Sequence, residues 1–171
     1  MRFLTLSKLG CLVTVLTACS PAATVKPAEK PVPANLTVPP GNALLLKVSA
    51  KGVQIYTCKP EGWVLKAPEA DLFDEKGAKV GHHSGGPTWE LNDGSAVIGE
   101  VKEKAPADGT IPWLLLAKKS TRGEGMLARV TFIQRLDTQG GKAPADGCDA
   151  GHQGAEARID YTGSYSFYAA Q

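Results

Sequence analysis

Short runs of apolar and β-branched residues, separated by turns rich in Gly, Pro, Asn and Asp, make up most of the chain from residue 39 onward. Residues 157–168, ARIDYTGSYSFY, show the clearest period of two, which is the spacing of one face of a β-strand. That face contains Ile159, Tyr161, Gly163, Tyr165 and Phe167. No sustained amphipathic helical pattern is present.

Turn sequences give the order of the strands. KPEG at 59–62 and NDG at 92–94 are typical of the tight turns that join antiparallel strands. The short runs at 63–65 and 70–73 are counted as separate strands. The pattern therefore predicts an all-β domain, either an antiparallel β-sandwich or a closed barrel of about nine or ten strands.

The N-terminal pattern is different and resembles a bacterial lipoprotein signal peptide over residues 1–18. Arg2 and Lys8 supply its basic region, and the apolar run that follows is far shorter than the roughly 20 residues of a membrane-spanning helix. The run ends in Leu16-Thr17-Ala18-Cys19, which matches a lipobox. We therefore expect cleavage before Cys19 and attachment of the lipid, with its palmitate chain, to this residue.

The signal also predicts a location and a domain plan. Ser20, rather than an Asp, follows the lipidated Cys19, which favours the outer membrane, with the protein facing the periplasm or the cell surface. Residues 19–38 form a Pro-rich segment without hydrophobic periodicity, and this composition is typical of a disordered tether. Residues 39–171 are then a single β domain.

Cleavage of the signal changes the charge of the protein. The whole chain has 19 basic and 17 acidic side chains. Arg2 and Lys8 leave with the signal, so the mature chain is formally neutral. No dense basic patch is interleaved with aromatic residues, and a nucleic-acid partner is not expected.

Four cysteines are present, and the predicted processing accounts for two of them. Cys11 leaves with the signal and Cys19 carries the lipid, so Cys58 and Cys148 remain. In an exported protein, such a pair favours a disulfide. The alternative is a thiolate metal site, but no CxxC spacing supports it, and we expect no metal and no cofactor.

The densest polar stretch is GHHSGGPTWE at 81–90, and the candidate functional residues lie in or just after it: His83, Trp89, Glu90 and Asp93. A trypsin-like serine protease is excluded because no His precedes this stretch. Neighbouring His residues on a strand point to opposite faces, which disfavours a shared metal ion. An acid–base pair of His83 and Glu90 competes with structural roles for the same residues: a loop hydrogen bond for His83, core packing for Trp89, a solvated face for Glu90 and a turn for Asp93.

Aromatic residues offer a different chemistry. Trp63 and Trp113 are candidates for stacking on a sugar ring or a peptide. The alternative is that they pack in the core or pair across strands.

Several segments together resemble the family called domain of unknown function 3455, which occurs in exported bacterial and fungal proteins. The matching segments are GVQIYTC at 52–58, APEADLFD at 67–74, GHHSGGPTWE at 81–90, DGSAVIGEV at 93–101, IPWLLL at 111–116, VTFIQRLDTQGGKAP at 130–144 and YTGSYSFY at 161–168. The family pattern places its histidine at His83. The resemblance implies no established activity, and the malate dehydrogenase label of some fungal members does not fit a chain without GxGxxG.

These observations lead to two hypotheses. The first is a cell-envelope lipoprotein that is a non-enzymatic binding or structural module, attached to the membrane through Cys19 and directed at a glycan, a peptidoglycan fragment or a protein partner. The alternative is a small periplasmic hydrolase or metal-handling protein centred on His83, Glu90 and Asp93.

Overall fold

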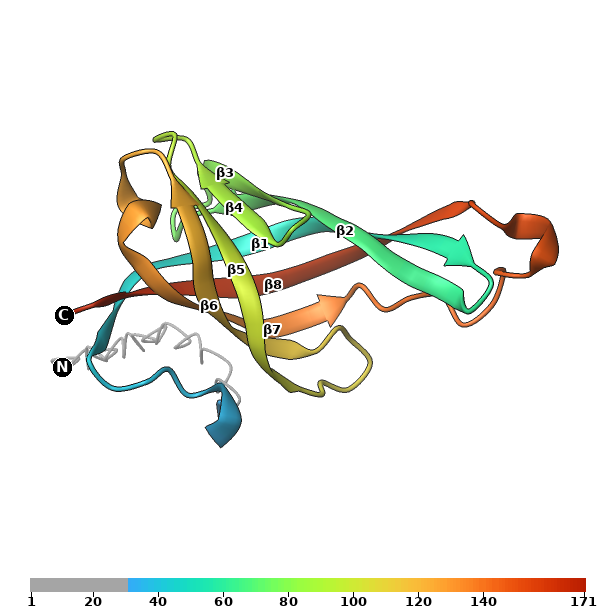
Figure 1. The fold of residues 1–171 in the computed structure, drawn as a ribbon, viewed down its shortest axis with the longest axis horizontal. Coiled ribbons are helices and arrows are strands. Elements are labelled where there is room, and N and C mark those ends of the chain that lie inside the picture. The colour runs from blue at the N-terminus through green and yellow to red at the C-terminus, as the bar shows by residue number, and fades with distance from the viewer. Residues whose placement is uncertain (1–30) are drawn as a thin grey trace, which may run out of the picture.

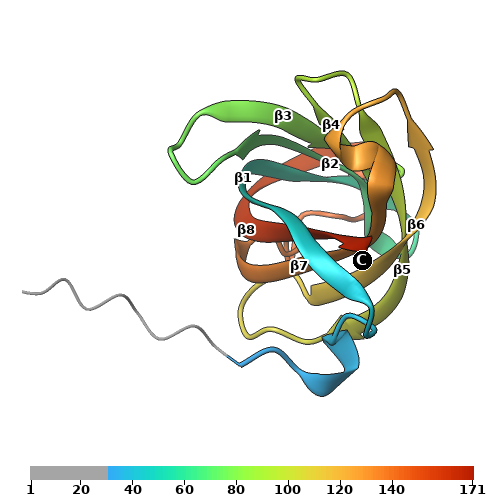
Figure 2. The ribbon, with the colours of Figure 1, turned by 90° about the vertical axis from the view of Figure 1, so that its left-hand side faces the viewer.

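A computed structural model describes residues 31–171, in which eight antiparallel strands close into one barrel (Figures 1 and 2). Each strand pairs with its neighbour in the sequence, and the last strand pairs with the first. The strands are β1 (Asn42–Lys59), β2 (Gly62–Phe73), β3 (Lys79–Ser84), β4 (Thr88–Leu91), β5 (Ala96–Ala105), β6 (Trp113–Arg122), β7 (Val130–Gly140) and β8 (Glu156–Ala170). The all-β prediction and its closed-barrel form are confirmed.

The barrel has eight strands rather than nine or ten because the runs at 63–65 and 70–73 are one strand, β2. This strand runs through Pro68, which lies opposite Gln54 of β1. On its other side β2 pairs with β3 only from Ala70 onward. Pro68 therefore stands at an unpaired edge, where a residue without an N–H does not break a ladder of hydrogen bonds.

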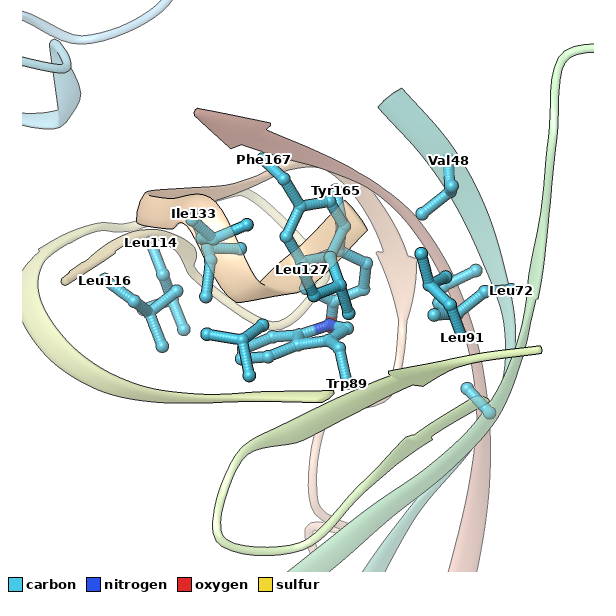
Figure 3. Close-up of a cluster of buried hydrophobic side chains, with 14 of the residues drawn as sticks. Val48, Leu72, Trp89, Leu91, Leu114, Leu116, Leu127, Ile133, Tyr165 and Phe167 are labelled. Carbon is cyan, nitrogen blue, oxygen red and sulfur yellow. The ribbon is translucent and has the colours of Figure 1, made fainter. Parts of the chain in front are cut away.

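Alternating residues of the strands fill the barrel. Tyr161, Tyr165 and Phe167 of β8 are at most 2% exposed, which confirms the predicted inward face. In Figure 3, Trp89 lies among side chains from facing walls, with Leu116 and Ile133 on one side of the indole. Gly99 lies close beside this indole, because a Cβ at that position would be 3.0 Å from both the Trp89 ring and Leu116, and these side chains would have to shift.

The end of the barrel that carries the β4–β5 and β6–β7 connections is closed. A short 3-10 helix, η2 (Met126–Arg129), places Leu127 in the core with no exposed surface. The Asp93 carboxylate holds this helix by accepting hydrogen bonds from the backbone N–H of Met126 (2.9 Å) and from Ser95.

At the opposite end, β1, β2 and β8 continue beyond the rest of the barrel as a three-stranded arm (Figure 1). Cys58 near the tip of β1 forms a disulfide with Cys148 in the β7–β8 connection, 90 residues away in the sequence. The predicted disulfide is confirmed, and it ties the long connection to the arm.

The segment before β1 packs against the outside of the barrel. Its 3-10 helix, η1 (Ala34–Leu36), places Leu36 in a second apolar cluster with Trp113 and Leu115. Gln134 Nε2 donates a hydrogen bond to the Leu36 carbonyl at 2.6 Å. Part of the segment expected to be a tether, 19–38, thus belongs to the folded domain. Residues 1–30, with the predicted signal and Cys19, lie outside the described residues.

Within residues 31–171, the structure has no helix of the length and apolar character that a membrane crossing requires.

Candidate functional site

A cavity of about 330 Å³ lies inside the barrel at the end that carries the arm. Its walls come from most of the strands and from the β3–β4 and β5–β6 connections. The lining is mostly apolar, with side chains such as Trp89, Leu114 and Leu116 deep in the barrel and Leu65 and Val101 at the mouth. The polar lining residues are Gln54, Tyr56, Lys66, His83, Lys104, Arg135 and Tyr165. This size and mixed lining are typical of sites for small organic ligands.

His83 is held rigidly in one wall of this cavity. It lies opposite Trp89 in the β3–β4 hairpin, and the two rings stack with centroids 4.4 Å apart and an interplanar angle of 6°. The Nδ1 atom is 2.8 Å from the Thr88 carbonyl, which only accepts hydrogen bonds, so Nδ1 carries the proton. Burial lowers the pKa of His83 to about 3, so the ring is neutral at pH 7 and its Nε2 is an acceptor.

Arg135 of β7 contributes a positive charge to the same cavity. It lies between Leu114 of β6 and Tyr165 of β8 in the sheet. Its Nε and Nη2 donate to the Pro112 carbonyl at 3.2 and 2.8 Å. Among residues 31–171, no Asp or Glu forms an ion pair with this guanidinium. The side chain is partly buried, so its charge is poorly solvated and has no counter-ion.

Several buried polar atoms around the cavity have no hydrogen-bond partner among the described residues. They include Gln54 Nε2 and Trp89 Nε1, both on lining residues. The hydroxyls of Tyr161 and Tyr165 are also buried, but they interact with each other, and the Tyr165 hydroxyl also interacts with the Arg135 side chain. Burial raises the pKa of Tyr165, so its hydroxyl keeps its proton, and the charge of Arg135 opposes that rise. By contrast, the Tyr56 hydroxyl donates to the Gly141 carbonyl at 2.6 Å.

The charged residues that line the cavity are all positive: Lys66, Lys104 and Arg135. Lys66 forms an ion pair with Glu156 at 2.5 Å, and both side chains are well exposed. Lys104 forms no ion pair within residues 31–171. Because Glu156 offsets Lys66, the net positive charge of the lining comes from Arg135 and Lys104.

Residues 39–169 match the family described as protein of unknown function (DUF3455). The chain belongs to the DUF3455 family. The resemblance noted in the sequence is thereby confirmed, and the match covers nearly the whole DUF3455 barrel, including every residue that lines the cavity. No curated protein and no solved structure matches the chain.

Two of the four candidate residues lie together in this DUF3455 cavity, and two do not. His83 and Trp89 stack inside the barrel, whereas Glu90 follows Trp89 on the outer face of β4, opposite His82. The Glu90 carboxylate forms an ion pair with Arg122. Adjacent residues of a strand point to opposite faces, so the wall of the barrel separates Glu90 from His83.

Asp93 lies at the other, closed end of the barrel. Its carboxylate accepts from the N–H of Met126 and from both the N–H and the hydroxyl of Ser95. These hydrogen bonds, that of Met126 first, hold the pKa of Asp93 below its usual value. Asp93 thus fastens η2 to the β4–β5 turn.

The two tryptophans considered for stacking lie outside the cavity. Trp63 is partly buried near the tip of the arm, where its Nε1 donates to the Asp146 carbonyl at 2.9 Å. Trp113 is 7% exposed and is covered by Leu36 and the rest of the second apolar cluster. Within residues 31–171, no three His, Cys, Asp or Glu side chains are grouped to hold a metal ion.

Sequence reasoning missed Gln54 and Arg135 as parts of a site. A signal for Arg135 was present, because it shares the period-two face of β7 with Ile133, which is completely buried. A cation on the inward face of a strand is costly and therefore informative.

Proposed function

We propose that this protein is a lipid-anchored cell-envelope lipoprotein and that its barrel is a binding module that takes a small ligand into the cavity at the arm end. The observation that carries the proposal is the cavity itself, which combines an apolar wall with buried polar atoms that lack partners. The lipid anchor on Cys19 and the outer-membrane location rest on the sequence of the signal.

Two energetic arguments support binding. A buried polar group without a hydrogen bond costs about 1–3 kcal/mol, so a ligand that accepts from Gln54 Nε2 or Trp89 Nε1 recovers part of that cost. Leu65 and Val101 at the mouth are 52% and 37% exposed. An apolar ligand seated between them would remove this surface from water.

The cavity is a better candidate for the binding site than an exposed strip of aromatic side chains that would stack on glycans. Trp113 is covered, and the Trp63 indole already donates to a backbone carbonyl in the arm. A mostly apolar lining favours a ligand with an apolar body over a peptidoglycan fragment. The alternative of a hydrolase or metal-handling protein gains no support, because His83, Glu90 and Asp93 lie in three separate places.

The binding proposal can be tested with the neutral fluorophore N-phenyl-1-naphthylamine. The full-length protein is incorporated in phosphatidylcholine nanodiscs, with empty nanodiscs as the blank. We expect saturable binding that Leu65→Ser weakens about fivefold, the loss that corresponds to about 1 kcal/mol of apolar contact. Leu44→Ser is the matched control, because Leu44 is 55% exposed but does not line this cavity. Absence of saturable binding, or equal effects of the two variants, would refute the proposal.

The anchor is tested separately by labelling cells with radioactive palmitate. We expect label on the wild-type protein and none on Cys19→Ser, with the label recovered in the outer-membrane fraction. Equal labelling of both proteins, or label only in the inner membrane, would contradict this part of the proposal.

A further inference from the structure

We infer that the cavity selects an amphipathic organic anion, with its acidic group held beside Arg135 and its apolar body directed along the barrel wall toward Leu65 and Val101. The inference rests on the binding function proposed above and adds the chemical class of the ligand.

The charge of the lining carries the inference. Arg135, Lys66 and Lys104 are its only charged residues, and all three are cations. Of these three, Arg135 would be stabilised most by an anion, because it is partly buried and has no acidic partner among the described residues. Pro112 accepts from two of its N–H groups on one edge, and the other N–H edge of the planar guanidinium suits a carboxylate or another oxyanion.

The neutral polar groups of the lining also favour a negatively charged ligand. Gln54 Nε2 and Trp89 Nε1 are donors without acceptors, and the Tyr165 hydroxyl can donate as well. All three side chains are at most 2% exposed. A wall that presents surplus donors around a cation favours a ligand rich in acceptors, which a carboxylate provides and an alkyl ammonium does not.

The apolar part of the ligand follows from the remaining walls and from the volume. Leu114, Leu116 and Trp89 line the interior, and Leu65 and Val101 line the mouth. A volume of about 330 Å³ is at the small end of organic ligand sites, so it fits one short chain or ring rather than a lipid with two long chains.

The test compares octanoate, octanol and octylamine, which share one alkyl chain and differ in the charge of the head group. Each is titrated calorimetrically into the full-length protein in phosphatidylcholine nanodiscs at pH 7, and empty nanodiscs give the partition blank. We expect octanoate to bind at least about tenfold more tightly than octanol, the size of one charge-assisted hydrogen bond, and octylamine to bind most weakly.

Two substitutions test the residues. Arg135→Met is expected to weaken octanoate at least about tenfold and to change octanol less than about twofold. Lys104→Met, at the exposed mouth, is expected to weaken octanoate about two- to fivefold, with the effect shrinking in high salt. Lys102→Met is the matched control on the same strand, because Lys102 is paired with Glu100 and does not line the cavity. The Lys104 comparison keeps the test valid if Arg135→Met does not fold.

The outcomes distinguish selection of an anion from binding of a ligand as such. Equal binding of octanoate and octanol, or equal effects of the Lys104 and Lys102 substitutions, would overturn anion selection while leaving a binding cavity in place. Displacement of N-phenyl-1-naphthylamine by octanol at the same concentration as by octanoate would have the same meaning. Failure of all these probes to bind would refute both proposals.

Discussion

The burial of a neutral histidine makes the stability of this barrel depend on pH. The perturbation is a change from pH 7 to pH 4.5 in the wild-type protein and in His83→Gln, which cannot titrate but retains a side-chain donor. Burial lowers the pKa of His83 from 6.5 to about 3 in the folded protein. At a pH between these two pKa values, the unfolded chain binds a proton at His83 that the folded chain does not. The free energy of unfolding therefore falls as the pH falls.

The magnitude follows from the width of this window. One proton bound only by the unfolded state changes the free energy of unfolding by about 1.36 kcal/mol for each pH unit. From pH 7 to pH 4.5 the histidine protonates in the unfolded chain over the last two units, which amounts to about 2.5 kcal/mol. This decrease in the free energy of unfolding is absent above pH 7 and reaches its maximum near pH 3.

Urea unfolding at a series of pH values, with the disulfide intact, measures the effect. The wild-type protein should lose about 2.5 kcal/mol more than His83→Gln between pH 7 and pH 4.5, whatever the absolute stability of the variant. His82→Gln is the matched control, because His82 is exposed on the outer face of the same strand. Parallel curves for wild type and His83→Gln would refute the reasoning and would mean that His83 gains a proton inside the folded barrel.

Three further predictions concern the scaffold. Replacing both Cys58 and Cys148 by Ser should lower the free energy of unfolding by about 2–5 kcal/mol, because the disulfide closes a long loop; thermal unfolding without reductant checks this, and an unchanged Tm would contradict it. Asp93→Ala removes one hydrogen bond from the Met126 N–H of η2 and two from Ser95, and it should cost about 1–3 kcal/mol in urea unfolding, whereas a neutral result would show that η2 does not need Asp93. Leu36→Ala should cost about 2–5 kcal/mol because Leu36 has no exposed surface, while Val32→Ala, at a residue 42% exposed, should cost little; equal costs would mean that η1 does not pack as described.

Much of the fold could be predicted because strands and turns follow from local patterns in the sequence. The period of two in β8 predicted an inward face that is buried in the barrel, apart from Ile159, which lies partly exposed in the arm. The NDG turn at 92–94 separates β4 from β5, and the cysteine count led to the Cys58–Cys148 disulfide. The number of strands was harder, because Pro68 ends a strand in most contexts and is tolerated here only at an edge.

The site was predicted only in part. His83 and Trp89 are neighbours across a tight hairpin, so the sequence already brought them close together. Glu90 lies next to Trp89 in the chain but on the outer face, and Asp93 lies at the other end of the barrel. Proximity in the sequence was misleading for these two residues, because each step along a strand reverses the direction of the side chain.

The amino-acid sequence determines the alternation of inward and outward residues, the turns and the pair of cysteines, since these depend on neighbours along the chain. The cavity depends on closure of the sheet, which brings Gln54 of β1, Arg135 of β7 and Tyr165 of β8 to one end of the barrel. The register between distant strands sets which residues meet there, and no local pattern contains that register. For the same reason the burial that keeps His83 neutral, and the absence of an acidic partner for Arg135 among the described residues, emerge only from the folded barrel.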